Sequence, residues 1–370
     1  MNRKYVFYAI VIAINISVVA ACAYFFFKHY SVVVYRKQTS PFMQTLSEMT
    51  VKSQQQAGDR QSVHINDFDY RKPHPYTGFK TQPSTLTRST DGTMRIETNS
   101  FGHRSPELGR KKPGVVRIAM VGGSVAFQGQ SNESTIIARL AELMSQRGIA
   151  VEFINTGVLS FVSEQEVAVL VHDLLDLEID LLVSFDGFND IHQMLYYNGR
   201  IGWPPVRWDN LGAEGSKHLN QLAPSYYPKV EPKLHETSPT AVVAALDSYL
   251  GNVEKMARIC KEYHIAYIAC LQPWKDYDPK ACQSGDTISN EYGSKDFFYC
   301  QAAKTFDTWD KERKFGAFYL PMAGFFANSK DSYIDECHFT DEANAVVAQK
   351  LLDVVAAQQL FATGQGQPGN

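Results

Sequence analysis

One serine and a distant Asp–His pair carry the residue types of a nucleophilic site. Ser124 follows Gly122 and Gly123 at the end of an apolar run, where glycine permits a sharp turn that exposes a hydroxyl. Asp335 and His338 stand three positions apart, so the aspartate can accept the Nδ1 proton while Nε2 faces a hydroxyl. A serine needs such a base, oriented by a third group, to attack an acyl carbon. Singly these residues suit turns and caps, but together they predict covalent catalysis.

Two further segments end in residues that can donate hydrogen bonds to a developing negative charge. Gly157 follows the apolar run 151–155, and Asn189 follows the run 181–185. With the N–H of Ser124, they supply three donors that could converge on one oxyanion. We therefore predict an oxyanion hole formed by Ser124, Gly157 and Asn189.

In order and spacing, these residues resemble the SGNH (GDSL-type) hydrolase superfamily. Its four blocks are matched by Ser124, Gly157, Asn189 and His338, and its D-x-x-H-x-T pattern by Asp335, His338 and Thr340. The resemblance covers about residues 117–357. It implies an α/β fold, namely a flavodoxin-like three-layer sandwich with a five-stranded parallel sheet. It also implies hydrolysis or transfer of small acyl esters by a Ser124–His338–Asp335 triad.

The chain departs from the family pattern at two places near the serine. Gly123 stands where the G-D-S block usually has Asp, and the next glycine of the pattern falls at Gly129, so Gln128 looks inserted. Upstream, residues 99–104 resemble a segment that precedes the catalytic domain in anchored relatives associated with surface polysaccharides. We interpret Arg104 there as part of a packed turn with Gly102 at positive φ, rather than as a catalytic residue.

Apolar runs that alternate with amphipathic segments predict a parallel α/β sheet. The expected strands are 117–121, 151–155, 181–185, 266–271 and 316–320. The expected helices are 134–146, 163–175, 241–263, 302–314 and a last one that Thr340 caps and that runs to about Ala357.

Two long insertions, about 191–240 and 274–300, follow strands and should emerge at the carboxyl edge of the sheet, where such folds keep their sites. The first carries an aromatic set that suits either a self-packed lid or stacking on sugar rings: Tyr196, Tyr197, Trp203 and Trp208. Asp186, Asp190 and His192 are interpreted as hydrogen-bonded scaffolding. No metal or cofactor is expected.

The N-terminus predicts a membrane anchor. Residues 5–27 form a run of 23 residues without charge, which as a helix would be about 34 Å long against a hydrocarbon core of about 30 Å. A cleaved signal peptide and lipidation of Cys22 are alternatives, but the apolar sequence continues past both processing sites. Lys and Arg lie on both sides of the run, so orientation follows only from the function, which favours an extracytoplasmic domain, periplasmic if the source is bacterial.

These features divide the chain into four parts: an anchor (1–37), a stalk with a small subregion (38–115), a catalytic domain (116–360) and a disordered tail (361–370). Five of the 36 basic residues and none of the 39 acidic residues lie in the first 37 positions. The remainder is therefore more negative than the whole chain, which disfavours nucleic-acid binding. Cys282 and Cys300 flank the polar stretch 283–299 and could close it with a disulfide.

The leading function is a membrane-anchored serine esterase that removes O-acyl groups, most simply O-acetyl, from a glycan through an acyl-Ser124 intermediate. The expected partners are an acylated glycan or another small acyl ester, and the membrane. An O-acyltransferase would use the same triad and oxyanion donors, so the sequence leaves that alternative open. A lipase or thioesterase, and a non-catalytic glycan-assembly component, are further alternatives.

Overall fold

The computed structural model describes residues 71–74, 76–88, 95–196, 238–278 and 291–361, all within one compact unit. At its centre is a five-stranded parallel sheet with the order β6-β5-β7-β8-β9. Each expected strand forms, and the bounds are β5 (Val116–Gly122), β6 (Val151–Asn155), β7 (Leu181–Asp186), β8 (Ala266–Leu271) and β9 (Phe318–Pro321). All of these strands therefore end at the same edge of the sheet.

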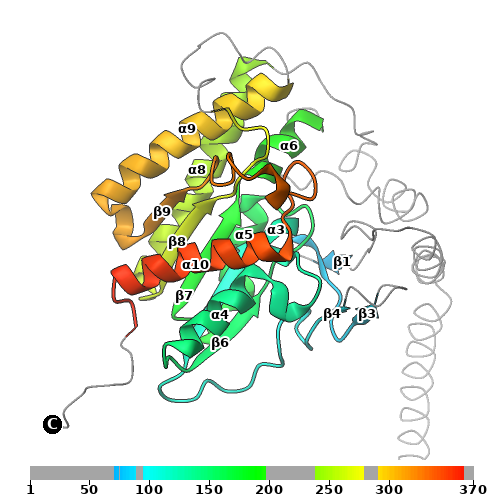
Figure 1. Cartoon of the computed structure of the whole chain (residues 1–370), viewed down its shortest axis with the longest axis vertical. Helices are drawn as coiled ribbons and strands as arrows, with labels where there is room; N and C mark the ends of the chain where they lie inside the picture. Colours follow the sequence, from blue (N-terminus) through cyan, green and yellow to red (C-terminus); the bar gives the residue numbers. More distant parts are fainter. Residues whose placement is uncertain (1–70, 75, 89–94, 197–237, 279–290, 362–370) are drawn as a thin grey trace, which may run out of the picture. The chain divides into compact units, whose positions relative to one another are not determined.

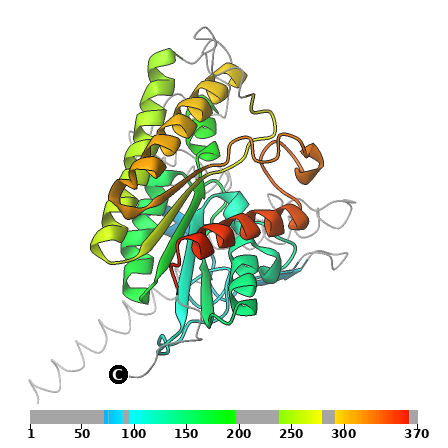
Figure 2. The ribbon, with the colours of Figure 1, turned by 60° about the vertical axis from the view of Figure 1, so that its left-hand side comes forward.

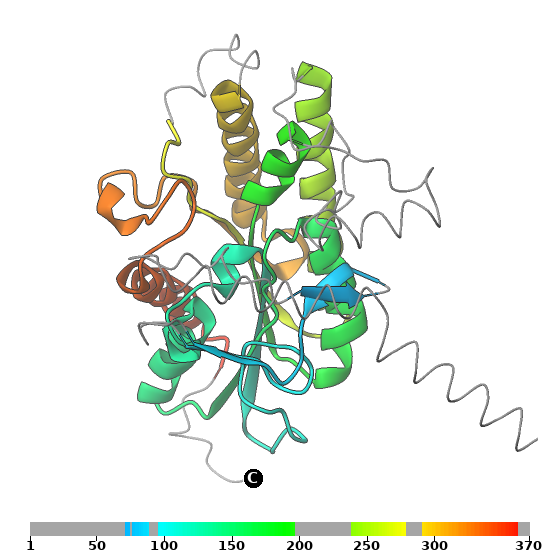
Figure 3. The same ribbon diagram turned by 90° about the vertical axis from the view of Figure 1, so that its right-hand side faces the viewer.

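Alternate residues of the central strands serve two separate cores. In β5, Ala119 and Val121 pack into one hydrophobic cluster, whereas Ile118 and Met120 pack into another. Every residue of β7 is buried, as a strand covered on both faces requires. The sheet is thus the middle of three layers, and Figure 3 shows it nearly edge-on between two groups of helices.

Helices cover both faces of the sheet. The first cluster collects residues of α5 (Ser163–Val169), α6 (Phe188–Tyr196), α8 (Pro239–Glu262) and α9 (Glu291–Glu312). The second collects residues of α4 (Ile136–Gln146) and α10 (Asp341–Ala357). In Figures 1 and 2, α4 and α10 lie together on one side of the sheet and α8 and α9 on the other. The expected three-layer arrangement is confirmed.

Two helices differ from the expectation. The helix expected over 163–175 continues past α5 as a π-helical turn (Leu170–Leu174) and a 3₁₀ turn (Leu175–Leu177). The helix expected at 302 begins at Glu291 instead, so the part of the polar stretch from 291 to 299 is helical. Lys295 and Phe298 there are fully buried, and Lys295 pairs with Glu336. Because a lysine occupies the buried face of this helix, the sequence does not show the spacing of apolar residues that is typical of a helix.

Upstream of the sheet, the chain forms two short antiparallel ribbons: β1 (Arg71–His74) with β2 (Gly78–Thr81), and β3 (Leu86–Arg88) with β4 (Arg95–Glu97). The Phe79 ring packs on Phe161, with centroids 5.3 Å apart, which joins β2 to the loop after β6. Within the described ranges no helix is both long and apolar enough to cross a membrane. The expected anchor, 5–27, lies outside them.

Candidate active site

Ser124 stands at the first position of a very short helix, α3 (Ser124–Phe127), directly after β5. The turn into this helix requires glycine, because Gly122 has φ +155° and a Cβ there would lie 2.5 Å from the Phe185 carbonyl oxygen. The serine therefore emerges at the carboxyl end of a central strand, and its side chain faces the loop before α10.

The structure brings Ser124, His338 and Asp335 into one hydrogen-bonded row. His338 Nε2 lies 2.7 Å from Ser124 Oγ, and His338 Nδ1 lies 2.7 Å from Asp335 Oδ2. The second carboxylate oxygen, Oδ1, accepts the backbone N–H groups of Cys337 and His338 at 2.9 and 2.8 Å. Asp335 therefore fixes both the ring and the backbone of His338, which leaves Nε2 to take a proton from the serine hydroxyl.

A small hairpin holds the histidine loop. The His338 carbonyl accepts the N–H of Ile334 at 2.8 Å, and Thr340 N–H donates to Ser332 at 3.0 Å. The Phe339 ring is buried and packs edge-on against Tyr333, with centroids 5.3 Å apart. As expected, the Thr340 side chain caps α10, accepting the Ala343 N–H. The packing of Phe339 on Tyr333 and the Thr340 cap together fix the position of His338 relative to the sheet.

The three expected oxyanion donors differ in the hydrogen bonds that they already make within the protein. The N–H of Ser124 is the first of α3, where helix N–H groups have no intrahelical partner. Asn189 Nδ2 donates one hydrogen to the Phe161 carbonyl at 2.8 Å, and a primary amide carries a second. The N–H of Gly157, in contrast, donates to Asn155 Oδ1 at 3.0 Å. An asparagine two residues upstream commonly captures an N–H in this way.

Gly157 has a packing role instead. A Cβ at this position would lie 2.6 Å from the backbone nitrogen of Phe127. Only glycine therefore lets the loop after β6 approach α3 so closely.

The unusual Gly123 also has a physical reason. A Cβ there would lie 2.3 Å from Asn189 Nδ2, although the φ of −82° is open to any residue. The amide of Asn189 occupies the space that the side chain of the family's usual aspartate would need. Gly123 thus sets where the Asn189 donor can lie relative to Ser124.

Three buried polar residues hold the chain around Ser124 through hydrogen bonds that the sequence did not predict. Gln128 Nε2 donates to the Phe339 carbonyl and so links the serine segment to the histidine loop. Asn155 Nδ2 donates to the Ala126 carbonyl at 2.8 Å. Arg104, interpreted above as a turn residue, is fully buried and reaches the end of α3. Their partners are mainly backbone carbonyl groups of distant segments, and a pattern of residue types does not predict such contacts.

Glu166, Asp186 and Asp190 form a group of buried or partly buried carboxyl groups with raised pKa values. Burial, with added repulsion from Asp186, raises the pKa of Glu166 well above its usual range. Asp186, at the end of β7, accepts the Tyr249 hydroxyl at 2.7 Å. Although part of Asp190 reaches the surface, its Oδ2 is buried, and its Oδ1 accepts the N–H and the hydroxyl of Ser163. Burial, with the charges of Glu164 and Asp186, raises the pKa of Asp190 to about 8.

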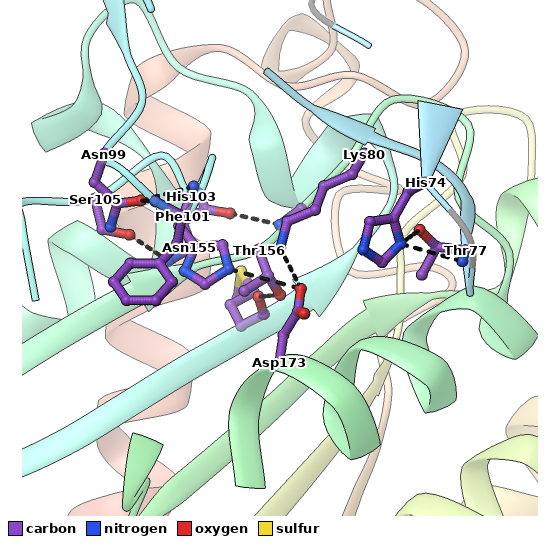
Figure 4. A network of polar contacts seen from close by, with 12 residues as sticks. His74, Thr77, Lys80, Asn99, Phe101, His103, Ser105, Asn155, Thr156 and Asp173 are labelled. Carbon is purple, nitrogen blue, oxygen red and sulfur yellow. Dashed lines mark hydrogen bonds and ion pairs between the residues drawn. The ribbon is translucent and has the colours of Figure 1, made fainter. Parts of the chain in front are cut away.

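A carboxylate on the same side of the sheet behaves in the opposite way. Figure 4 shows Lys80, from β2, and His103 reaching Asp173. Burial acts to raise the pKa of Asp173, but the nearby His103, with Nε2 3.9 Å away, and the hydrogen bond from Lys80 outweigh it and hold the pKa at about 2.

Other sequence expectations at this edge have mixed outcomes. Among the described residues, the one group with metal-ligand geometry is Asp335, Cys337 and His338, and two of these ligand atoms already hydrogen-bond to each other in the Ser–His–Asp row. Asp186 and Asp190 are hydrogen-bonded as expected. Cys300 is in a disulfide, and its expected partner, Cys282, lies outside the described ranges, as do Tyr197, Trp203 and Trp208.

Among the comparisons with known proteins, only the comparison of three-dimensional structures found similar proteins. No protein-family model matches the chain, and no curated protein matches it either. Among solved structures, the acetylxylan esterase Axe2 from Geobacillus stearothermophilus is similar with a TM-score of 0.40 and 10% identity, over 68% of this chain and 97% of that one. A protein described as a GDSL-like lipase from Parabacteroides merdae gives 0.41 and 14%, over 69% and 100%. A two-domain esterase active on acetylated mannans gives 0.35 and 14%, over 69% and 52%.

Likenesses this distant add no argument to the geometry described above. The parallel five-stranded sheet, the serine at the end of β5 and the row formed by Ser124, His338 and Asp335 agree with what the resemblance to SGNH (GDSL-type) hydrolases implies. A serine hydroxyl held in such a row can attack an acyl carbon.

The packing of Gly123 against Asn189 predicts a steric effect on catalysis. In Gly123→Ala, the methyl group displaces the Asn189 amide and removes an oxyanion donor, so kcat for a small acyl ester falls about 10²-fold with little loss of thermal stability. Adding Asn189→Ala to Gly123→Ala should then cost almost nothing more, because both act through the same amide. Fully additive losses in the double variant would contradict this coupling.

The raised pKa of Asp190 predicts a pH-dependent stability. Between an ordinary pKa of 3.8 and about 8, the native protein holds a proton that the unfolded chain has lost, so stability falls as pH rises through this window and then levels off. Asp190→Asn removes this loss and keeps an acceptor for Ser163. Its advantage in free energy of unfolding over wild type should grow by about 1 kcal/mol or more from about pH 5 to pH 8.

Asp173→Asn is the matched control, and its sign is opposite. The lowered pKa of Asp173 stabilises the native state above about pH 4, and this contribution disappears as pH falls toward about 2. Asp173→Asn should therefore be less stable than wild type at neutral pH. Thermal unfolding across the pH range measures both variants, and a constant offset for Asp190→Asn would refute the buried-proton account.

Proposed function

We propose that this protein is a membrane-anchored, extracytoplasmic serine esterase that removes O-acyl groups, most simply O-acetyl, from a glycan. The observation that carries the proposal is the row of two 2.7 Å hydrogen bonds from Asp335 through His338 to Ser124. Asp335, His338 and Ser124 are its catalytic residues, and the Ser124 N–H and the Asn189 amide are its oxyanion donors.

The geometry performs the reaction in two steps. In the first, Ser124 Oγ attacks the acyl carbon, His338 Nε2 takes the hydroxyl proton, and Asp335 stabilises the imidazolium that forms. The carbonyl oxygen becomes an oxyanion that the Ser124 N–H and the Asn189 amide stabilise. The proton then passes from His338 to the sugar oxygen, which leaves as an alcohol. In the second step, His338 takes a proton from water, and the resulting attack releases the carboxylic acid and restores Ser124.

Sequence features support the glycan and the location. The uncharged run 5–27 can anchor the chain, and the residues after it carry a negative balance that does not favour nucleic acid. The aromatic insertion after Asn189 supplies the ring faces on which sugars stack. A reporter fused to the C-terminus and assayed for export tests the location.

A series of p-nitrophenyl esters of increasing acyl length tests the substrate class on the full-length protein. We expect kcat/KM to be highest for acetate and to fall with chain length, and Ser124→Ala to abolish turnover at every length. A maximum at long chains would contradict the short-acyl proposal and favour a lipase. The same assay with an acceptor oligosaccharide, read by mass spectrometry, separates the alternatives, because an acylated acceptor instead of free acetate would identify a transferase.

The oxyanion role of Asn189 gives a second prediction. Asn189→Ala should lower kcat about 10²- to 10³-fold with KM much less affected, because the lost hydrogen bond forms mainly in the transition state. Asn189→Asp should be at least as harmful, since it places an acceptor-only charge where negative charge develops. Tm and kcat measured on the same preparations decide the point. A kcat unchanged in a folded Asn189→Ala would remove this residue from the mechanism.

A further inference from the structure

The Arg104 side chain comes from the segment upstream of the sheet and ends against the helix that carries Ser124. It is fully buried. Its Nη1 donates to the Phe127 carbonyl, and its Nη2 donates to the Gly129 carbonyl at 2.7 Å. The guanidinium carbon also lies 5.0 Å from the centre of the Phe127 ring. One planar group thus holds two carbonyls on either side of Gln128.

These carbonyls need external donors because α3 is only four residues long. The last carbonyl groups of a helix have no intrahelical partner, and here the next residues are extended, with Gln128 at ψ 151°. Asn155 Nδ2 satisfies Ala126, and Arg104 satisfies Phe127 and Gly129. The chain that follows Ser124 is therefore tied at three points, so α3 cannot shift without breaking bonds to a charged group.

Arg104 is itself held at a fixed place. Its backbone N–H donates to the Asn155 carbonyl at 3.0 Å, and the N–H of Asn155 donates to Ser105 Oγ at 3.1 Å. Gly102, at φ +84°, makes the turn before it, where a Cβ would meet the Thr81 carbonyl oxygen at 2.5 Å. Figure 4 shows Asn99, His103 and Ser105 from this segment close to Asn155. The arginine is thus braced against the same residue that ties Ala126.

A guanidinium suits this place better than an ammonium. Its rigid fork reaches two carbonyls and still presents Nε, which donates to Asn132 Oδ1 at 3.0 Å. A lysine offers one point charge that cannot bridge both carbonyls. Burying a cation is costly, and here the geometry that it fixes is that of the residues directly after the nucleophile.

We propose that Arg104 is a positioning residue for Ser124, so that the segment before the sheet forms part of the active site. The proposal rests on the proposed role of Ser124 as the nucleophile. By holding the end of α3, Arg104 keeps Ser124 Oγ within 2.7 Å of His338 Nε2 and keeps the Ser124 N–H aimed at the oxyanion. A misplacement of about 1 Å in such a site costs up to about 10²-fold in rate.

The test compares Arg104→Lys and Arg104→Ala in the full-length protein with a matched pair at Arg117. Arg117 is also buried, but it lies at the opposite end of β5, where it binds Glu152 at 2.7 Å and the Leu177 carbonyl. For each variant, Tm, kcat and KM for p-nitrophenyl acetate, and the rate of labelling by a phosphonofluoridate serine probe, are measured.

Arg104→Lys should lower kcat and the labelling rate together by about 10- to 100-fold, with KM changed less than about threefold. Arg117 variants with an equal loss of Tm should keep the kcat of wild type. Added guanidinium ion should restore part of the activity of Arg104→Ala and none of that of Arg117→Ala.

Two results would overturn the proposal: a kcat for folded Arg104→Lys within about twofold of wild type, or losses of kcat that follow Tm equally in both series. If neither Arg104 variant folds, Asn132→Ala keeps the arginine but removes its Nε acceptor, together with two exposed bonds to the Glu97 backbone. It should lower kcat in a protein of near-normal Tm, and an unchanged kcat would count against the role. Failure of the proposed function would instead appear in the wild type, as absent labelling of Ser124.

Discussion

The hydrogen bond between Ser124 Oγ and His338 Nε2 joins residues 214 positions apart at 2.7 Å, and the rest of the site depends on that short distance. Each partner lies just past a sharply defined boundary. Gly122 ends β5 with a backbone that only glycine adopts, and Thr340 starts α10 with a side-chain cap. Gln128 then ties the two loops directly, through the Phe339 carbonyl. The nucleophile and the base are thus held by the same local bonds and not only by the sheet beneath them.

The pKa of each buried carboxyl group in this domain depends on whether a cationic side chain lies next to it. Asp173 has Lys80 as its cationic partner and stays ionised, with a pKa of about 2. Asp190 has hydroxyl and N–H partners only, so burial raises its pKa to about 8, and Glu166 is shifted in the same direction. Burial without a cationic partner therefore favours the protonated form of these carboxyl groups, whereas a cationic partner favours the ionised form.

The sequence predicted those parts of the structure that depend on a pattern within one short segment of the chain. The five strands follow from apolar runs, α10 from the Thr340 cap, and the Ser–His–Asp row from Asp335 and His338 three positions apart. The N-terminal half of α9 was missed because Lys295 is buried on its inner face. The engagement of the Gly157 N–H by Asn155, and the role of Arg104, depend on backbone groups brought together from distant segments, and side-chain patterns carry no signal for those.

Three separate segments therefore determine where the nucleophile lies. The histidine loop reaches the chain after Ser124 through Gln128, the end of β6 reaches it through Asn155, and the segment before the sheet reaches it through Arg104. Each of these bonds involves a residue within five positions of the serine, because a helix as short as α3 cannot fix its own position by internal hydrogen bonds. The short helix presents the serine hydroxyl at the rim of the sheet. Because so short a helix is not rigid by itself, the buried polar side chains around it hold it in place.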